Sequence, residues 1–367
     1  MRIGFKGNVV DEPEIRAGFI GCGSHSFRNI YPVFHFAPVN LVAVCDLDLN
    51  KAQAFSKKFG ADHAYTDYRE MLAKEKLDAV FIVTGYDASG RPLYPAIAAD
   101  CLNTGCHVWI EKPPAASCAD IDIMRDASKK SGKHVVVGMK KMFFPANEKA
   151  KVLSAAPEFG CVSMAMLQYP QAIPTREEFV QYIEKKERVK SVVSFLDHQC
   201  HPVSLFIYLL GMPETLFYCR ASSGAGSATF TYASGVVATL AFTHGTSRNG
   251  GMEHTTVIGD KGQHITVENN TRVTLHRDPP GLGYGDTPGF YNGSAHEASA
   301  VWEPEFSLGQ LYNKGIFLLG YFSEVNEFAR AILDKRAPAK GTLDQARQVT
   351  RIFEAFAEGS GKVIALA

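Results

Sequence analysis

The sequence predicts a chain with two α/β parts: a doubly wound parallel sheet, followed by an α+β domain with a large, open, mainly antiparallel sheet. Three observations support this fold class. The 367 residues are too many for one ordinary hydrophobic core. The first part alternates short Val- and Ile-rich runs with helical patterns, which is typical of parallel strands covered on both faces. The second part has period-2 runs between tight turns, which indicates antiparallel hairpins.

The alternating pattern of the first part sets its order of elements. Buried strands are expected at 16–21, 41–46, 78–84, 107–111 and 134–139. Helical patterns are expected after the glycine-rich turn that follows the first strand and at 48–59, 92–105 and 118–132, and a connector with a short helix is expected at 64–77. Gly60 and Gly105 provide helix stops.

The second part begins where this alternation ends, near residue 144. Its strands are expected at 160–169, 215–221, 226–232, 235–243, 254–258 and 263–268, and its helices at 196–211, 321–333 and 342–359. The stretch 279–315 is rich in Gly and Pro and is long for a plain connection, so we expect a functional or oligomer-contact loop. We therefore divide the chain into an arm (1–15), a first domain (16–143) and a second domain (144–367) whose closing helices can pack back on the first.

Composition excludes several classes of protein. Lys and Arg total 38 and Asp and Glu total 38, so no net basic charge favours nucleic acid or a polybasic membrane anchor. No apolar stretch reaches the roughly 18 residues that a membrane span needs. The eight cysteines form no C-x-x-C pair, and several lie in apolar runs as small hydrophobic residues, so we expect reduced thiols, no zinc knuckle and a cytoplasmic protein.

A glycine-rich turn follows the first strand and is the first candidate site. Its residues are Gly21, Cys22, Gly23, Ser24, His25 and Ser26. The first glycine allows a tight turn, and the second lets the backbone approach a pyrophosphate at a helix N-terminus. Asp46 ends the next strand, where an acid can accept both ribose hydroxyls of NAD and repel the extra phosphate of NADP. An ordinary strand-to-helix turn and a helix-capping Asp46 are the alternative interpretation.

Two further groups carry candidate chemistry. Lys112, in Glu111-Lys112-Pro113, lies at the carboxyl end of the fourth strand, where doubly wound sheets bind ligands. Asp197 and His201 are four residues apart and share one helix face, so a carboxylate could orient an acid–base imidazole. The alternatives are a surface lysine and a structural helix pair. His198-x-x-His201 lacks a companion carboxylate at suitable spacing, so no metal site is expected.

Taken together, these motifs resemble the Gfo/Idh/MocA oxidoreductases. The resemblance runs from about residue 16 to the C-terminus through GFIGCGSHS, VCDLD, EKP, HVVVGMKKMFFP, the D-x-x-x-H of LDHQCH, VIGDKG, SEVNEFARAIL and TLDQARQV. It implies an N-terminal Rossmann domain and a C-terminal domain whose open sheet forms a homodimer or homotetramer. It also implies NAD(P)-dependent oxidation or reduction of a sugar or cyclitol hydroxyl.

The resemblance also implies roles for individual residues. Lys112 would contact the reacting oxygen, Asp197 would orient or share a proton, and His201 would be the base. The glycine turn, Ser24, His25 and Ser26 included, would hold the pyrophosphate of NAD and Asp46 its ribose. Residues expected on the nicotinamide side or at the substrate are Thr84, Gly85, Glu111, Lys112, Lys140, Asp197 and His201.

The chain departs from the family pattern at several positions. The segment after the third strand, Gly85–Tyr94, is longer than usual and places Tyr94 where a histidine is common. Lys140 replaces a common asparagine, Met142 a common arginine and Ser204 a common acid. Lys140, Lys141 and Arg91 either favour an acidic or phosphorylated sugar or are solvated loop charges. Two other functions stay open: an NAD-dependent glycosidase that recycles its hydride, and a non-catalytic sensing protein.

Overall fold

The computed structural model describes residues 2–3, 9–10, 12–247, 252–278, 299–304 and 314–366. Most of the 1–15 arm and of the 279–315 stretch lies outside these ranges, so the expectations for both stay predictions. Within the arm, β1 (Arg2–Ile3) and β2 (Val9–Val10) pair antiparallel. No helix among the described residues is both long and apolar enough to cross a membrane.

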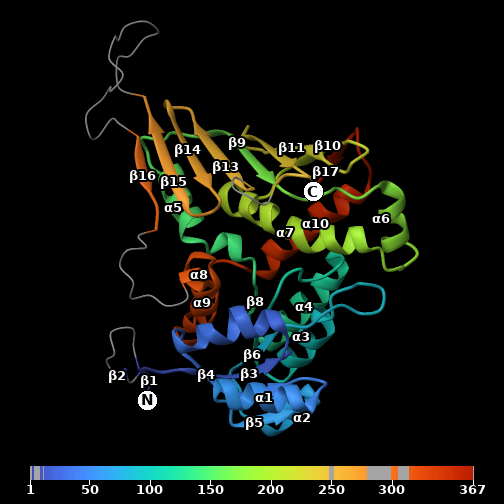
Figure 1. The fold of residues 1–367 in the computed structure, drawn as a ribbon, viewed down its shortest axis with the longest axis vertical. Helices are drawn as coiled ribbons and strands as arrows, with labels where there is room; N and C mark the ends of the chain where they lie inside the picture. The colour runs from blue at the N-terminus through green and yellow to red at the C-terminus, as the bar shows by residue number, and fades with distance from the viewer. Residues whose placement is uncertain are drawn as a thin grey trace, which may run out of the picture.

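The first sheet is parallel, as predicted, and has six strands, one more than the five that the sequence predicts. In spatial order these are β5 (His63–Tyr65), β4 (Val39–Cys45), β3 (Ile15–Ile20), β6 (Ala79–Ile82), β7 (His107–Ile110) and β8 (Val135–Val137). This is the order of a doubly wound dinucleotide fold, and it reverses between β3 and β6. Figure 1 shows this sheet in the lower half of the molecule. The short edge strand β5 was expected only as part of a connector.

Helices flank this sheet near the predicted positions. They are α1 (Leu49–Phe59), α2 (Tyr68–Lys74), α3 (Tyr94–Asn103) and α4 (Cys118–Ser131). Gly60 ends α1 with a left-handed φ of 80°. The helix expected after the glycine turn is instead a π-helical turn at Ser26–Ile30 followed by a 3-10 helix at Tyr31–His35. Pro32 contributes to this, because it has no N–H for an α-helical bond to residue 28.

The second sheet has nine strands and is mainly antiparallel, as predicted. Its spatial order is β16 (Ala300–Trp302), β15 (Arg272–Arg277), β14 (Gln263–Glu268), β13 (His254–Gly259), β9 (Val162–Tyr169), β12 (Val237–Phe242), β11 (Gly226–Thr231), β10 (Thr215–Arg220) and β17 (Val363–Ala365). Only β9 and β12 pair in parallel among these strands, at the centre of the sheet. The sequence had indicated neither β15, β16 nor β17.

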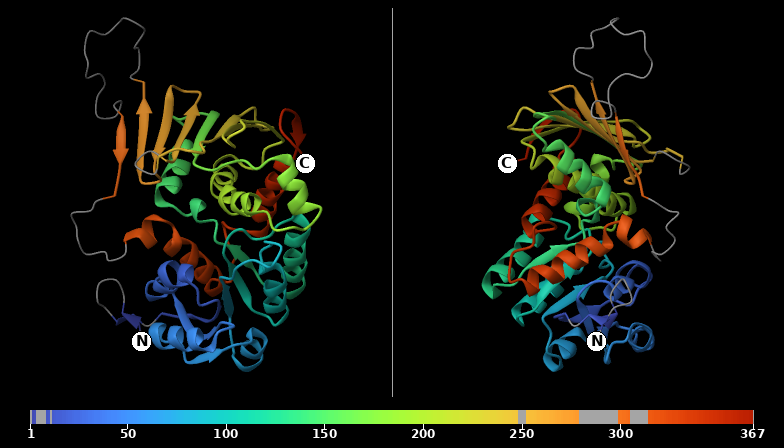
Figure 2. Two further views of the ribbon diagram at one scale, coloured as in Figure 1. Left: turned by 45° about the vertical axis from the view of Figure 1, so that its right-hand side comes forward. Right: turned by 90° about the vertical axis from the view of Figure 1, so that its left-hand side faces the viewer.

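Helices lie on one face of this sheet, toward the first sheet (Figures 1 and 2). They are α5 (Pro145–Ser154), α6 (Arg176–Ile183), α7 (Lys190–Leu210) and α10 (Leu343–Ala357), of which α5 and α6 were not predicted. The remaining helices are α8 (Lys314–Leu318) and α9 (Tyr321–Leu333). The chain returns to the first sheet through α9, because the rings of Phe328 and Phe81 lie 5.4 Å apart.

All eight cysteines are free thiols, as expected from their spacing. Six are buried and two, Cys161 and Cys219, are exposed. The strand expected at 160–169 includes Cys161 as a small hydrophobic residue, and this is wrong, because Cys161 precedes β9 and is exposed.

Candidate active site

The glycine turn lies at the switch point of the first sheet, directly after β3. Gly21 has a φ of 109°, and a Cβ there would approach the Val83 carbonyl oxygen to 1.9 Å. Only glycine fits this position. Ser26, which takes the place of a third glycine, is fully buried, and its hydroxyl donates to the Gly21 carbonyl at 2.9 Å. The Ser26–Gly21 hydrogen bond therefore holds the turn in its conformation.

The outer side of this turn is open. A Cβ on Gly23 would meet the Ser26 Oγ only at 4.0 Å, and one on Gly85, after β6, would meet nothing within 4 Å. Thr84, which directly precedes Gly85, has a buried hydroxyl with no partner among the described residues. The backbone at Gly23 and Gly85 is therefore not covered by other described residues, and the Thr84 hydroxyl is available to a ligand. Doubly wound folds bind dinucleotides at this switch point.

Asp46 ties the end of β4 to the turn. Its carboxylate accepts the Cys22 N–H at 2.8 Å and the Asp48 N–H at 3.0 Å. The interpretation of Asp46 as the helix cap is wrong, because Asp48 caps α1 by accepting the N–H groups of Asn50 and Lys51. Asp46 therefore keeps a half-exposed carboxylate next to the turn.

His25 joins the turn to the end of β7. Its Nε2 lies 2.8 Å from Glu111 Oε1, and Asn29 Nδ2 lies 3.1 Å from its Nδ1. Since the Asn29 amide can only donate and the Glu111 carboxylate accepts, His25 carries its proton on Nε2. Glu111 is almost fully buried and also accepts the Lys112 backbone N–H at 3.0 Å. Ser24 is exposed on the open side of the turn.

Lys112 and Asp197 form an ion pair between the two parts of the chain. Lys112 Nζ donates to Asp197 Oδ1 at 2.8 Å, and the Tyr86 hydroxyl donates to the same oxygen at 3.1 Å. Burial opposes the lysine charge, but Asp197 and Glu111 outweigh it and raise the pKa of Lys112 above its ordinary value. Lys112 is therefore a charged hydrogen-bond donor at neutral pH rather than a base.

His201 is buried next to this pair with a different set of neighbours. Its side chain is 8 % exposed, and its Nδ1 has no partner among the described residues. Burial, followed by the charges of Lys112, Lys140 and Lys141, lowers the pKa of His201 well below its ordinary value. The expected Asp197–His201 contact is absent from the described hydrogen bonds, because Asp197 is taken by the stronger, charged donor Lys112. His201 is thus a neutral imidazole able to accept a proton.

The other histidine of this helix has a contact of its own. His198 is exposed, and its Nδ1 lies 2.8 Å from the Ser194 carbonyl oxygen. No group of three or more metal-binding side chains occurs within the described part of the chain.

A pocket of about 550 Å³ opens beside His201. Its lining includes Lys140, Lys141, Phe144, Tyr169, His198, His201, Glu253 and Asn270. Lys141 is 3 % exposed and forms an ion pair with Glu253, so its interpretation as a solvated loop charge is wrong. Lys140 is half-buried, and its Nζ lies 3.0 Å from the Tyr321 hydroxyl oxygen. Arg91 is not among these lining residues and lies 3.7 Å from Asp120.

Sequence reasoning missed several residues of this site, among them Tyr86, Glu253 and Tyr321. Tyr86 belongs to the segment that departs from the family pattern, and that departure was the available signal. Glu253 and Tyr321 lie far along the chain from the lysines they contact, so no local spacing could have shown them.

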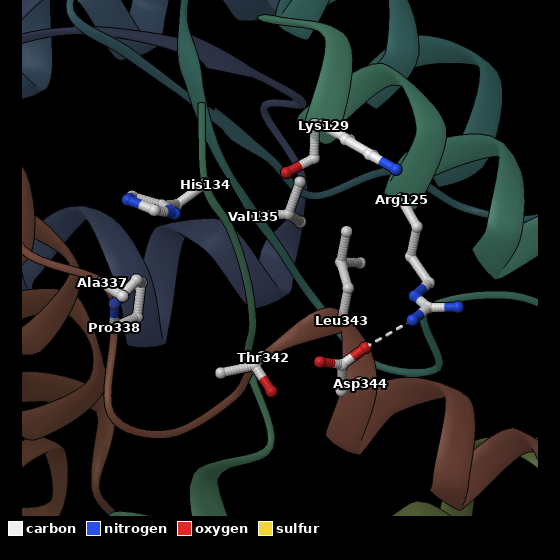
Figure 3. Close-up of a pocket in the computed structure, with 10 residues that line it drawn as sticks. Arg125, Lys129, His134, Val135, Ala337, Pro338, Thr342, Leu343 and Asp344 are labelled. Atoms are coloured by element: carbon white, nitrogen blue, oxygen red, sulfur yellow. Dashed lines mark ion pairs between the residues drawn. The ribbon is translucent and has the colours of Figure 1, made fainter. Parts of the chain in front are cut away.

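A second pocket, of about 250 Å³, lies at the contact of α4 with the start of α10 (Figure 3). None of the expected site residues lines it. Its Arg125 is paired with Asp344 at 2.8 Å, so this charge is already compensated. We assign no function to this pocket.

The first sheet and its glycine turn have the architecture of a dinucleotide-binding Rossmann domain. Residues 15–139, which form the first sheet and its helices, match the Gfo/Idh/MocA model, described as an oxidoreductase family with an NAD-binding Rossmann fold. The expected resemblance and fold class are confirmed.

Curated relatives match only part of their own length. A 4-carboxy-2-hydroxymuconate-6-semialdehyde dehydrogenase from Sphingobium sp. is 26 % identical over 54 % of this chain and 59 % of its own. A scyllo-inositol 2-dehydrogenase (NADP(+)) from Bacillus subtilis is 31 % identical over 37 % of this chain and 40 % of its own. This chain thus spans about half the length of the curated relatives it matches.

Solved structures share the whole fold. A dehydrogenase from Chromobacterium violaceum superposes with a TM-score of 0.78 at 21 % identity, covering 95 % of this chain and 96 % of that one. An Agrobacterium radiobacter oxidoreductase, solved with NAD+, L-tartaric acid and magnesium, gives 0.75 at 12 % identity, covering 96 % and 98 %. At these identities the likeness establishes the fold.

Proposed function

We propose that this protein is an NAD-dependent dehydrogenase that oxidises a secondary hydroxyl, or reduces the matching ketone, of a sugar, sugar derivative or cyclitol. The observation that carries the proposal is the placement of a charged Lys112 and a neutral, buried His201 next to a dinucleotide turn. Relatives with sugar and inositol dehydrogenase names support the substrate class.

The cofactor site fits NAD through the chain's own residues. Gly21 and Gly23 leave the turn open for the pyrophosphate, and Asp46 is the acid for the adenosine ribose. Its carboxylate repels the phosphate on the ribose of NADP, so we propose NAD as the preferred cofactor. Thr84, Gly85 and Glu111 line the nicotinamide side, with the unpaired Thr84 hydroxyl available to it.

Lys112 and His201 have different roles in the proposed reaction. When bound, NAD+ supplies the acceptor for the hydride that leaves the carbinol carbon with its electron pair. The Lys112 ammonium donates a hydrogen bond to the reacting oxygen and stabilises the charge that develops there. His201 accepts the hydroxyl proton. Asp197, held by Tyr86, is the positioning residue that aims the lysine.

Turnover assays test the proposal. A panel of sugars, uronates, hexose phosphates and inositols is incubated with NAD or NADP, and NADH or NADPH is followed by its near-ultraviolet absorbance. We expect NAD-linked turnover of at least one compound, lost on the order of a thousandfold in Lys112→Met, which removes the donor to the reacting oxygen, and in His201→Asn, which removes the base. Turnover unchanged in both variants contradicts these roles.

The proposal includes a homo-oligomer, a dimer or tetramer, formed through the nine-stranded sheet. One face of this sheet carries the helices (Figure 2). Its other face presents Thr229, Thr239, Met166 and Thr256, which are not buried in the chain itself. Light scattering of the purified protein tests this part of the proposal.

A further inference from the structure

We infer that the substrate of this enzyme carries a carboxylate group, and that the Lys140 ammonium binds it in the pocket beside His201. This inference rests on the proposed dehydrogenase function and narrows its substrate to a sugar acid. Lys140 is at the start of the 3-10 helix Lys140–Met142, directly after β8, and shares its pocket with the candidate base.

Lys140 is held in place by aromatic side chains. Its Nζ lies 3.0 Å from the Tyr321 hydroxyl oxygen and 4.9 Å from the centre of the Tyr321 ring. The Phe144 ring lies at 6.0 Å. These contacts fix the position of the ammonium without neutralising it, because aromatic faces attract a cation but carry no net charge.

The other two lysines of the site already have carboxylate partners. Lys112 pairs with Asp197 and Lys141 pairs with Glu253. Lys140 has no carboxylate within ion-pair distance among the side chains that the structure describes. A half-buried ammonium without such a partner binds an anion more strongly than a paired one does.

Two buried acids, Glu111 and Glu324, act on the charge of Lys140 without forming an ion pair with it. Glu324 is fully buried on α9, and neither of its carboxyl oxygens has a partner within the described part of the chain. Burial, followed by the charge of Glu111, raises the pKa of Glu324 well above its ordinary value. Burial thus disfavours the charged form of Glu324, and Glu324 makes no hydrogen bond or ion pair with Lys140 among the described contacts. Burial likewise lowers the pKa of Lys140, which an incoming anion would reverse.

The number of charges favours a carboxylate over a phosphate. One free ammonium matches one negative charge, whereas a phosphate monoester carries nearly two at neutral pH. Lys141, the neighbouring lysine, cannot supply the second positive charge while Glu253 holds it. Asn270 donates to the same Glu253 carboxylate at 2.9 Å and so stabilises that pair.

The test compares substrates that differ only at one carbon. Glucose, glucuronate and a glucose phosphate, and the matching galactose series, are assayed with NAD. We expect the uronate to exceed its parent hexose in kcat/KM by on the order of 10–100-fold, the range of one charge-assisted hydrogen bond. In Lys140→Met the uronate-to-hexose ratio should fall by a similar factor. Lys140→Arg should keep most of the preference, because it keeps the charge.

A matched control separates this contact from a change in net charge. Lys58 is exposed on α1, and Lys58→Met should leave the ratio unchanged. A hexose or a hexose phosphate preferred over the uronate overturns the inference, and so does a ratio that Lys140→Met leaves unchanged. If none of these compounds is oxidised, the proposed function fails for them. Calorimetric titration of the uronates into the wild type and into Lys140→Met then tests the inference. We expect the wild type to bind a uronate more tightly than Lys140→Met does, and equal affinity of the two proteins, or no binding to either, overturns the inference.

Discussion

Two donors meet one oxygen of Asp197, and that atom links the two parts of the site. Lys112 comes from the end of β7, Tyr86 from the end of β6, and Asp197 from α7. The Tyr86 loop is itself fixed across the domains, because the Tyr182 hydroxyl donates to the Gly90 carbonyl at 3.0 Å. The position of the Lys112 side chain is therefore set by the Tyr86 loop and by α7, which belong to different parts of the chain.

Tyr86→Phe tests this arrangement at the residue scale. Losing a hydrogen bond to a charged acceptor costs about 1.5–3 kcal/mol, so we expect kcat to fall roughly 10–100-fold. Affinity for NADH should not change, because Tyr86 does not contact the glycine turn. Steady-state kinetics and NADH fluorescence titration measure the two quantities. Tyr65→Phe, which removes a remote bond to Glu75, is the control. A kcat equal to that of this control would contradict the role of Tyr86.

The pH dependence of oxidation tests His201. Its pKa is lowered by burial and by the neighbouring lysines, so protonation requires more acid than for a free histidine. We expect kcat/KM to stay level from about pH 8 to below about 6.5, the ordinary histidine pKa, and to fall only at lower pH. The alkaline limb should lie above 10.5, because the pKa of Lys112 is raised. An acid limb centred at or above 6.5 would contradict a buried, neutral base.

The sequence predicted these residues unevenly. Lys112, Asp197 and His201 follow recognisable motifs, and the structure brings them together. Their pairing was predicted only in part, because a helical spacing shows that Asp197 and His201 share a face but not that Lys112 competes for the carboxylate. That competition depends on residues 85 positions apart.

At the scale of elements, the glycine turn gives a matched pair of substitutions. Gly21→Ala forces a Cβ to 1.9 Å from a carbonyl oxygen at a left-handed φ, so it should destabilise the protein by more than about 2 kcal/mol. Gly23→Ala meets no protein atom within 3.9 Å of its new Cβ, since the nearest lies at 4.0 Å.

We therefore expect Gly23→Ala to keep its stability within about 0.5 kcal/mol. Its affinity for NADH should fall on the order of tenfold, because the methyl group overpacks the cofactor site at a cost of about 1–3 kcal/mol. Denaturant unfolding and fluorescence titration measure the pair. Unchanged affinity in Gly23→Ala would mean that the pyrophosphate does not approach this turn.

The Lys141–Glu253 pair joins the 3-10 helix after β8 to the start of β13. Glu253→Gln leaves a buried ammonium without its counter-charge, and we expect a loss of about 3 kcal/mol in the free energy of unfolding. Adding Lys141→Met removes that charge and should recover most of the loss. Chemical denaturation of the single and double variants measures the coupling. If the two substitutions changed the free energy of unfolding additively, this would contradict a direct Lys141–Glu253 pair.

The elements that were missed share a physical reason. β16 and β17 have three residues each, too few to show a period of two. β15 has only Val273 and Leu275 buried between arginine ends. β5 is also a three-residue edge strand. Long strands and helices with glycine or aspartate signals at their ends were located to within a few residues, because those signals act locally.

At the scale of the whole molecule, the charge balance and the site agree. With 38 basic and 38 acidic residues, the chain offers no general attraction for anions. Positive charge at the proposed site is instead local, on Lys112 and Lys140, and the proposed dinucleotide would be held by backbone and glycine geometry. The long-range order of the chain, in which α9 returns to the first sheet and brings Tyr321 to Lys140, was not readable from the sequence, because it depends on contacts between distant residues.

Net formation of NADH is the most direct test of the central claim. The wild type is given the best substrate of the panel with excess NAD, and NADH and ketone product are quantified together. A dehydrogenase should form one NADH for each ketone, and Lys112→Met should abolish both. Consumption of substrate without net NADH, or an NAD requirement without any oxidised product, would contradict a dehydrogenase.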